Sequence, residues 1–321
     1  MAGALLTLLL VGYRSAPVRE AVCHQDLAGI TLADPTIFNF QGTFYLYGTD
    51  GQDPNSGFRV YTSTDLVDWG TPAGNKDGFA LKAQDVFGEK GFWAPQVWQD
   101  GDSFYMAYTA NENISIAVST SPLGPFVQST EKPLFPDGKQ IDPFVFHDTD
   151  GKLYIYYVKL HQGNRIYVAQ LADDYASIVA GTEKECVHAT LRWENVDDAD
   201  WPVTEGPTVI KKGDWYYLFY SANDFRNPKY AVGAAVAKHP AGPWKKRTDG
   251  PLLSQHNTGW AGTGHGDVFF ANDQYYYVCH THFSASKVGP RRTALIQMDF
   301  NSHVDGHQAP VFKGDSFRFL K

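Results

Sequence analysis

The feature that most constrains the fold is a bend followed by an aromatic strand, a phrase that occurs five times along the chain. In the first copy, Asp34-Pro35 precedes the run Phe44-Tyr45-Leu46-Tyr47. The other four bends are Trp93-Ala94-Pro95, Ile141-Asp142-Pro143, Thr204-Glu205-Gly206-Pro207 and Gly264-His265-Gly266-Asp267. Marked by Pro35, Pro95, Pro143, Pro207 and Asp267, the copies lie 60, 48, 64 and 60 residues apart. A period of this size predicts a propeller or a solenoid.

Each repeat unit has the pattern of about four short β-strands. Runs rich in Tyr, Phe, Val and Ile are separated by Gly-Asp, Asp-Gly and Asn-Asp turns, which are typical of hairpins. We find no long segment with helical period. A chain of 321 residues accommodates five such units in one domain. The sequence therefore predicts an all-β fold, a single five-bladed β-propeller over residues 26–321.

Residues 1–25 have a different character from the rest of the chain. The run 4–12 is apolar, but it is shorter than the roughly 20 residues that a membrane-spanning helix needs. It resembles the apolar core of a secretory signal, although no basic residue precedes it. We expect an export segment or a disordered N-terminal segment here, and an export segment implies a periplasmic, cell-surface or secreted protein. The alternative is a buried first strand, and no other run is long enough for a transmembrane segment.

Composition excludes some partners. The net charge of -8 argues against nucleic acid, because binding to phosphates relies on Lys and Arg. The three cysteines, Cys23, Cys186 and Cys279, lack the spacing of metal ligands, and an odd number forms no complete disulfide framework. Nothing in the sequence indicates an oligomeric state.

The repeated bend also suggests chemistry. The innermost strand of each propeller blade lines a central channel, so rotation brings Asp34, Asp142 and Glu205 to one mouth of it. Carboxylates that lie close together disfavour each other's ionisation, so one retains a proton near neutral pH while another stays charged. Hydrolysis of a glycosidic bond needs such a pair. The alternative for each acid alone is a turn cap at the start of a strand.

From about residue 30 to the end, the chain resembles glycoside hydrolase family 43. The motifs occur in the family's order and spacing: Leu32-Ala33-Asp34-Pro35, Phe92-Trp93-Ala94-Pro95-Gln96-Val97, Ile141-Asp142-Pro143-Phe144, Thr204-Glu205-Gly206-Pro207 and Gly262-Thr263-Gly264-His265-Gly266. The resemblance implies a five-bladed propeller that hydrolyses its substrate with inversion and needs no cofactor for the chemistry. It makes Asp34 the general base, Glu205 the general acid, and Asp142 the residue that orients the acid and adjusts its pKa.

The resemblance implies roles for two further residues. His265 corresponds to a histidine near the propeller axis, beside the substrate, which in that family often binds a structural calcium ion. Arg292 stands where many members carry an arginine that contacts the sugar, and Arg291 is its neighbour.

Two aromatic features have more than one interpretation. Trp93 at the channel mouth either stacks on a sugar face or packs between blades. His280 and His282 lie on one face of a strand, and we favour packing or pocket lining over a metal site because no Asp or Glu is near them in the sequence. The loop residues Asn223, Asp224 and Arg226 follow a strand that leads toward the mouth.

The expected function is exo-acting release of a terminal pentose, α-L-arabinofuranose or β-D-xylose, from plant-type polysaccharides or oligosaccharides. A galactan- or galactoside-active member of the same family is one alternative. A retaining fructan or sucrose hydrolase is disfavoured because Leu32-Ala33-Asp34-Pro35 and Ile141-Asp142-Pro143 differ from the motifs of those enzymes. A non-catalytic carbohydrate-binding propeller is the alternative from another class, although binding alone leaves the three acids unexplained.

Overall fold

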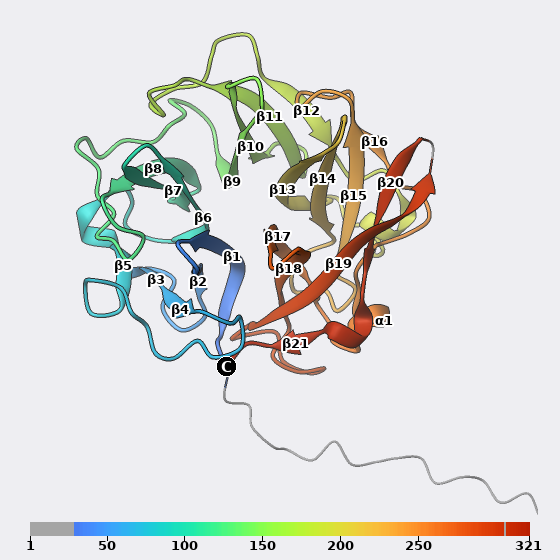
Figure 1. Cartoon of the computed structure of the whole chain (residues 1–321). Coiled ribbons are helices and arrows are strands. Elements are labelled where there is room, and N and C mark those ends of the chain that lie inside the picture. Colours follow the sequence, from blue (N-terminus) through green and yellow to red (C-terminus); the bar gives the residue numbers. More distant parts are fainter. Residues whose placement is uncertain (1–28, 305) are drawn as a thin grey trace, which may run out of the picture.

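A computed structural model describes residues 29–304 and 306–321, and it is a five-bladed β-propeller (Figure 1). The fold class predicted from the repeat is therefore confirmed. The expected export segment, residues 1–25, lies outside the described residues. No helix within the described ranges is long and apolar enough to cross a membrane.

The first two blades are irregular at their outer edges. Blade 1 consists of β1 (Leu32–Phe40), β2 (Thr43–Asp50) and β4 (Tyr61–Ser63), with the separate pair β3 (Gly57–Arg59) and β5 (Phe79–Lys82). Blade 2 consists of β6 (Trp93–Asp100), β7 (Ser103–Ala110) and β8 (Asn113–Ser119). The main sheet of each of these two blades therefore has three strands and not four.

The other three blades have four antiparallel strands or more. Blade 3 consists of β9 (Gln140–His147), β10 (Leu153–Leu160), β11 (Asn164–Leu171) and β12 (Lys184–Val187). Blade 4 consists of β13 (Thr204–Lys212), β14 (Trp215–Ala222), β15 (Ala231–Ala237) and β16 (Lys245–Lys246). Blade 5 consists of β17 (Gly264–Ala271), β18 (Gln274–Thr281), β19 (Arg292–Val304), β20 (His307–Phe312) and β21 (Arg318–Phe319).

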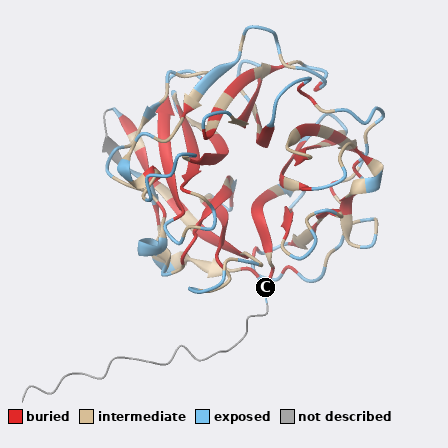
Figure 2. Ribbon diagram, turned by 180° about the vertical axis from the view of Figure 1, so that it is seen from behind, coloured by how far each residue is buried: buried red, intermediate tan, exposed pale blue. Residues whose placement is uncertain are grey.

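Helical structure within the described residues is limited to single turns. These are α1 (Gln255–Thr258) and the 3-10 turns η1 (Ala83–Asp85), η2 (Arg192–Glu194) and η3 (Gly314–Ser316). Figure 2 shows that the buried residues are concentrated in the blades around the axis, while the connecting loops are exposed.

The repeated bend is a β-bulge in the inner strand of every blade. Pairing with the second strand shifts register at the bend in all five blades. The residue at each shift has a positive φ: Asp34 (50°), Ala94 (45°), Asp142 (56°), Gly206 (58°) and His265 (36°). These five residues are therefore equivalent under the rotation of the propeller, and we call them the bend residues.

This equivalence corrects the register that we expected for two residues. Glu205 precedes the bend residue Gly206, so it is not the rotational equivalent of Asp34 and Asp142; it corresponds to Trp93. Asp267 pairs with Val278 in the way that Thr36 pairs with Tyr47, so Asp267 takes the position of a threonine and not of a proline. Comparing motifs alone missed the offset because proline and glycine mark bends without marking side-chain register.

The neighbouring blade holds the backbone of each bend residue. In four blades, the N–H group donates to a side chain on the second strand of the preceding blade: Asp34 to His280 Nδ1 (3.1 Å), Ala94 to Thr49 Oγ1 (3.0 Å), Asp142 to Thr109 Oγ1 (3.0 Å) and His265 to Ser221 Oγ (2.7 Å). The equivalent position in blade 3 is Val158, which has no acceptor. The N–H of Gly206 donates instead to Oδ2 of Asp142 (3.1 Å).

The repeated proline-glycine phrases dock onto neighbouring blades through buried tyrosines. The hydroxyl of Tyr47 in blade 1 donates to the carbonyl of Pro122 (2.5 Å), which follows the last strand of blade 2. In the same way, Tyr156 in blade 3 donates to the carbonyl of Pro240 after β15 of blade 4 (2.6 Å). A buried hydroxyl needs such a partner, so the two phrases fasten adjacent blades.

Residues from both ends of the described chain complete blade 5. Ile30 donates its N–H to the carbonyl of Leu320, Leu320 donates to Thr293, and Thr293 donates to Ile30, each at 3.0 Å. The ring is therefore closed by hydrogen bonds between segments that are distant in the sequence.

Asp267 joins three blades at the channel. Its carboxylate accepts hydrogen bonds from the hydroxyls of Thr36 in blade 1 and Thr208 in blade 4, each at 2.6 Å. Burial raises the pKa of Asp267 to about 6, although these two hydrogen bonds act in the opposite direction.

We expect Asp267→Asn to remove part of the pH dependence of stability. The unfolded residue titrates near 3.8 and the folded one at about 6, so the folded state binds more protons between these values. The contribution to the free energy of unfolding therefore falls by about 3 kcal/mol as the pH rises through this window, and is constant above it. Urea unfolding of both proteins from about pH 4 to about pH 7 measures the effect. Two parallel stability curves would contradict it.

Candidate active site

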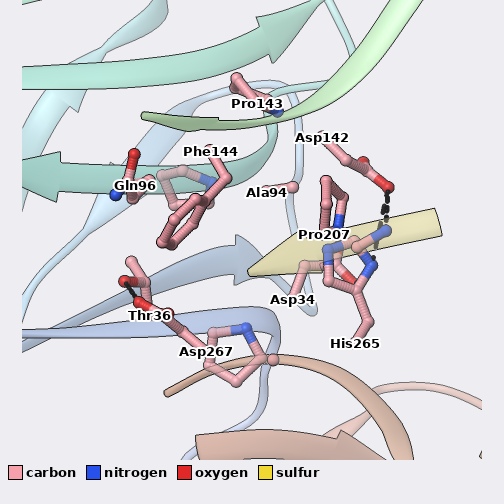
Figure 3. A pocket seen from close by; sticks show the side chains of 14 residues that line it. Asp34, Thr36, Ala94, Gln96, Asp142, Pro143, Phe144, Pro207, His265 and Asp267 are labelled. Atoms are coloured by element: carbon pink, nitrogen blue, oxygen red, sulfur yellow. Dashed lines mark hydrogen bonds and ion pairs between the residues drawn. The ribbon is translucent and has the colours of Figure 1, made fainter. Parts of the chain in front are cut away.

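A cavity of about 610 Å³ lies at the channel mouth where the inner strands begin. Asp34, Asp142, Glu205, Trp93 and His265 all line it. The structure therefore brings together five of the six site residues expected from the sequence. Figure 3 shows a smaller pocket that shares three of them, Asp34, Asp142 and His265, whose side chains lie close together.

Asp34 is surrounded by groups that favour its charged form. The Arg291 guanidinium donates to Oδ1 (2.9 Å), and the Thr49 hydroxyl donates to Oδ2 (2.7 Å). Burial alone raises the pKa of this carboxyl, but the charge of Arg291 and the hydrogen bond from Thr49 hold the pKa well below its usual range. Asp34 is therefore an ionised carboxylate at neutral pH.

Asp142 and Glu205 have the opposite tendency. Burial raises the pKa of Asp142 well above its ordinary value, and the negative charges of Glu205 and Asp34 raise it further. Burial likewise raises the pKa of Glu205 to about 7, with Asp34 contributing in the same direction. The two carboxyls are coupled, so the pair retains a proton near neutral pH.

Two buried neutral side chains fix the Glu205 carboxyl. The Tyr230 hydroxyl donates to Oε1 (2.8 Å), and the Asn164 amide donates to Oε2 (3.0 Å). Asp142 is held next to β13, the strand that carries Glu205, because its Oδ2 accepts the N–H of Gly206. A side chain at position 206 has no room, since a Cβ there would lie 2.7 Å from the His265 ring.

His265 lies between the two aspartates. Its Nδ1 is 3.3 Å from Oδ1 of Asp34 and 3.8 Å from Oδ2 of Asp142. Burial lowers the pKa of His265, which favours the neutral ring. Within residues 29–304 and 306–321, no three His, Cys, Asp or Glu side chains are grouped to hold a metal ion. The described residues therefore give no support to the calcium ion that the resemblance implied near His265, bound through water or directly.

His280 lies between Asp34 and Tyr230. Its Nδ1 accepts the N–H of Asp34 (3.1 Å), and its ring stacks on Tyr230 with centroids 5.7 Å apart. Burial lowers the pKa of His280 well below its usual value, and the Arg291 charge adds to this effect. The residue is a neutral packing and hydrogen-bonding group at the site.

Arg292 is the one expected site residue that the structure does not bring to the cavity. Its guanidinium lies over the Phe319 ring, 3.5 Å from the centroid, and 5.1 Å from that of Trp260. Successive residues of a strand point to opposite faces, so Arg291 faces the cavity and Arg292 faces away. The pair of arginines in the sequence contained no signal to choose between them.

Sequence reasoning also missed Asn164, Tyr230, Trp201 and Phe225, which line the cavity or touch the acid. They lie on outer strands or loops, outside the repeated phrase. Thr49, Thr109, Ser221 and His280 had a usable signal, because each stands 16 positions after the residue that precedes a bend residue.

The arrangement can perform acid–base chemistry. One cavity contains a carboxylate that stays ionised and a carboxyl pair that keeps a proton. Such a combination can activate water on one side of a bond and protonate a leaving oxygen on the other side.

Comparison with known proteins agrees with this geometry. A family model for glycosyl hydrolases family 43 matches residues 28–304. The exo-α-(1→5)-L-arabinofuranosidase ArbA of Cellvibrio japonicus, an extracellular protein, is 24% identical, with 88% of this chain and 86% of the relative covered. Xylosidase/arabinosidase 43A of Humicola insolens is 28% identical over 76% of this chain and 86% of its own length.

A solved structure is more similar. The endo-1,4-β-xylanase structure from Bacteroides thetaiotaomicron has a TM-score of 0.81 and 38% identity, with 88% of this chain and 94% of that chain covered. The family model, the shared fold and the acid–base cavity lead to one assignment: this chain is a glycoside hydrolase that belongs to family 43.

Proposed function

We propose that the protein is an inverting, exo-acting glycoside hydrolase that releases a terminal pentose, with α-L-arabinofuranose as the first candidate and β-D-xylose as the second. The observation that carries the proposal is the opposite charge state of Asp34 and the Asp142–Glu205 pair in one cavity. No cofactor takes part in the steps below.

Asp34 acts as the general base. Its ionised carboxylate accepts a proton from a water molecule while that water attacks the anomeric carbon. Arg291 and Thr49 hold both carboxylate oxygens, so the side chain is positioned before substrate binds. Arg291 takes the sugar-contacting role that the sequence had suggested for Arg292, since it lines the cavity.

Glu205 acts as the general acid. Its proton passes to the glycosidic oxygen as the bond to the anomeric carbon breaks, which avoids an alkoxide leaving group. Asp142 orients the acid through the backbone of Gly206 and raises the pKa of the carboxyl pair. Trp93 presents an aromatic surface to the same cavity and stacks on the sugar.

The pentose assignment rests on the relatives. Both named relatives act on arabinose- or xylose-containing substrates, and ArbA is described as exo-acting. The B. thetaiotaomicron structure is described as an endo-xylanase, which makes xylan the main competing substrate. We further propose export of the protein, because the apolar run 4–12 fits a secretory signal and ArbA is extracellular.

Replacing the acid is expected to have an effect that depends on the leaving group. Glu205→Ala lowers kcat about 100- to 10,000-fold on a pentose disaccharide, and far less on a dinitrophenyl pentoside, whose leaving group needs no proton. Asp34→Ala lowers kcat on both substrates, because both reactions need the activated water. The exposed acid Asp173 provides a matched control, Asp173→Asn. Equal losses on both substrates in Glu205→Ala would contradict the assignment.

The pH profile of kcat/KM is expected to fall on the basic side. Glu205 must be protonated, so activity is lost as the pH rises through its pKa of about 7. Asp34 must be ionised, and its pKa is well below the usual value, so the acidic limb lies below about pH 4. Measuring kcat/KM for a disaccharide from below about pH 4 to above about pH 7 tests both limbs. A basic limb that persists in Glu205→Ala would assign it to another group.

The stereochemistry and the substrate are tested together. Nitrophenyl α-L-arabinofuranoside, β-D-xyloside and galactosides are compared for turnover, and NMR identifies the anomer of the first product. We expect inversion and the highest kcat/KM on a pentoside. Retention would contradict the water-activation step, and preference for a galactoside would replace the pentose assignment. Monosaccharide as the first product from a polysaccharide indicates exo action.

A further inference from the structure

The cavity rim has an exposed tryptophan to which the proposed mechanism assigns no role. Trp201 lines the cavity, and 50% of its surface is exposed. It lies in the segment between η2 and β13, close in sequence to Glu205. An indole that is exposed beside a sugar-binding cavity offers a flat apolar face to a pyranose or furanose ring.

Trp201 is connected to Glu205 through one side chain. Its indole N–H donates to Oδ1 of Asn164 (2.9 Å), and Nδ2 of Asn164 donates to Oε2 of Glu205 (3.0 Å). Asn164 is itself buried, with 9% exposed. The three residues thus form a chain of hydrogen bonds from the rim to the acid.

The indole determines which end of the Asn164 amide faces Glu205. An amide carries an acceptor oxygen at one end and a donor nitrogen at the other, and either end can point toward a carboxyl. The indole nitrogen can only donate, so it binds the oxygen and turns the NH2 group toward Glu205. With this orientation, the amide donates to the carboxylate form and stabilises it.

The backbone around this chain is firmly held. The N–H of Asn164 donates to the carbonyl of Pro202 (2.9 Å), and the Thr204 hydroxyl donates to the carbonyl of Asn164 (3.0 Å). The segment that leads to Trp201 is anchored at Glu194, a fully buried carboxylate that binds Lys246 (2.7 Å) and Tyr220 (2.5 Å). The indole is therefore positioned before any ligand is bound.

We propose that Trp201 is the stacking platform for the leaving-group sugar, and that through Asn164 it is also a positioning residue for Glu205. The inference rests on the proposed function, since the acid protonates the oxygen of the leaving group and that sugar must lie on the acid's side of the cavity. Trp201 then has two roles: it contacts the leaving-group sugar, and it orients Glu205 through Asn164.

The platform is tested by comparing two substrates. A pentose disaccharide has a leaving-group ring, whereas a pentosyl fluoride has none. We expect Trp201→Ala to raise KM for the disaccharide about tenfold and to leave KM for the fluoride unchanged. Phe270→Ala is the matched control, because Phe270 is 54% exposed and lines a different hollow. An unchanged disaccharide KM in Trp201→Ala overturns the platform.

The positioning role is tested by the pH profile. Trp201→Phe keeps an aromatic face but removes the N–H group, so the amide of Asn164 is free to turn. Losing a donor to the carboxylate form raises the pKa of the acid, so the basic limb for the disaccharide moves up by roughly half a unit or more. Asn164→Ala is expected to shift it in the same direction. An unmoved limb in Trp201→Phe overturns this role, whether or not the limb moves in Asn164→Ala.

The activity of the wild-type protein distinguishes failure of the proposed function from failure of the role given to Trp201. If the wild-type protein turns over neither substrate, the proposed function fails. If it turns over both, and the Trp201 variants behave as Phe270→Ala does, the function stands and this inference fails. Trp201 is half-exposed, so its replacement leaves the core intact, and circular dichroism of each variant checks this.

Discussion

The structure depends on five residues that adopt the left-handed backbone conformation, one at the start of each inner strand. Residues other than glycine rarely adopt this conformation, and each instance costs on the order of 1–3 kcal/mol unless its surroundings enforce it. In four blades this enforcement comes from the preceding blade, through the acceptors Thr49, Thr109, Ser221 and His280. The blades therefore stabilise one another at the same place where they present functional side chains.

The exception in this pattern explains the position of Asp142. Val158 occupies the position where the other blades have an acceptor, so the N–H of Gly206 is left for the Asp142 carboxylate. A carboxylate in this role is costly to bury, and its pKa rises accordingly. One apolar residue in the third blade is thus linked to the protonation state of the acid pair. The link exists because a buried backbone N–H group needs an acceptor.

The repeat in the sequence was sufficient to predict the fold and to place three acids at one mouth. Period and turn residues define blades because they depend on local backbone preferences. The register of Glu205 and Asp267 was not predictable in this way, since a bulge moves side chains by one position without changing the motif. The choice between Arg291 and Arg292 likewise required the strand's orientation relative to the cavity. Asn164, Tyr230 and Trp201 come from outer strands and loops, where no repeated pattern marks them.

The ion pair between Asp34 and Arg291 joins residues that are 257 positions apart. His265 and His280, whose Nδ1 atoms lie 3.3 Å and 3.4 Å from Oδ1 of Asp34, belong to blade 5 as well. During synthesis, the first blade leaves the ribosome long before these partners exist, and a nascent chain with four blades would contain an aspartate without its cationic neighbour. The charge environment of Asp34 is therefore complete only after blade 5 has joined the ring.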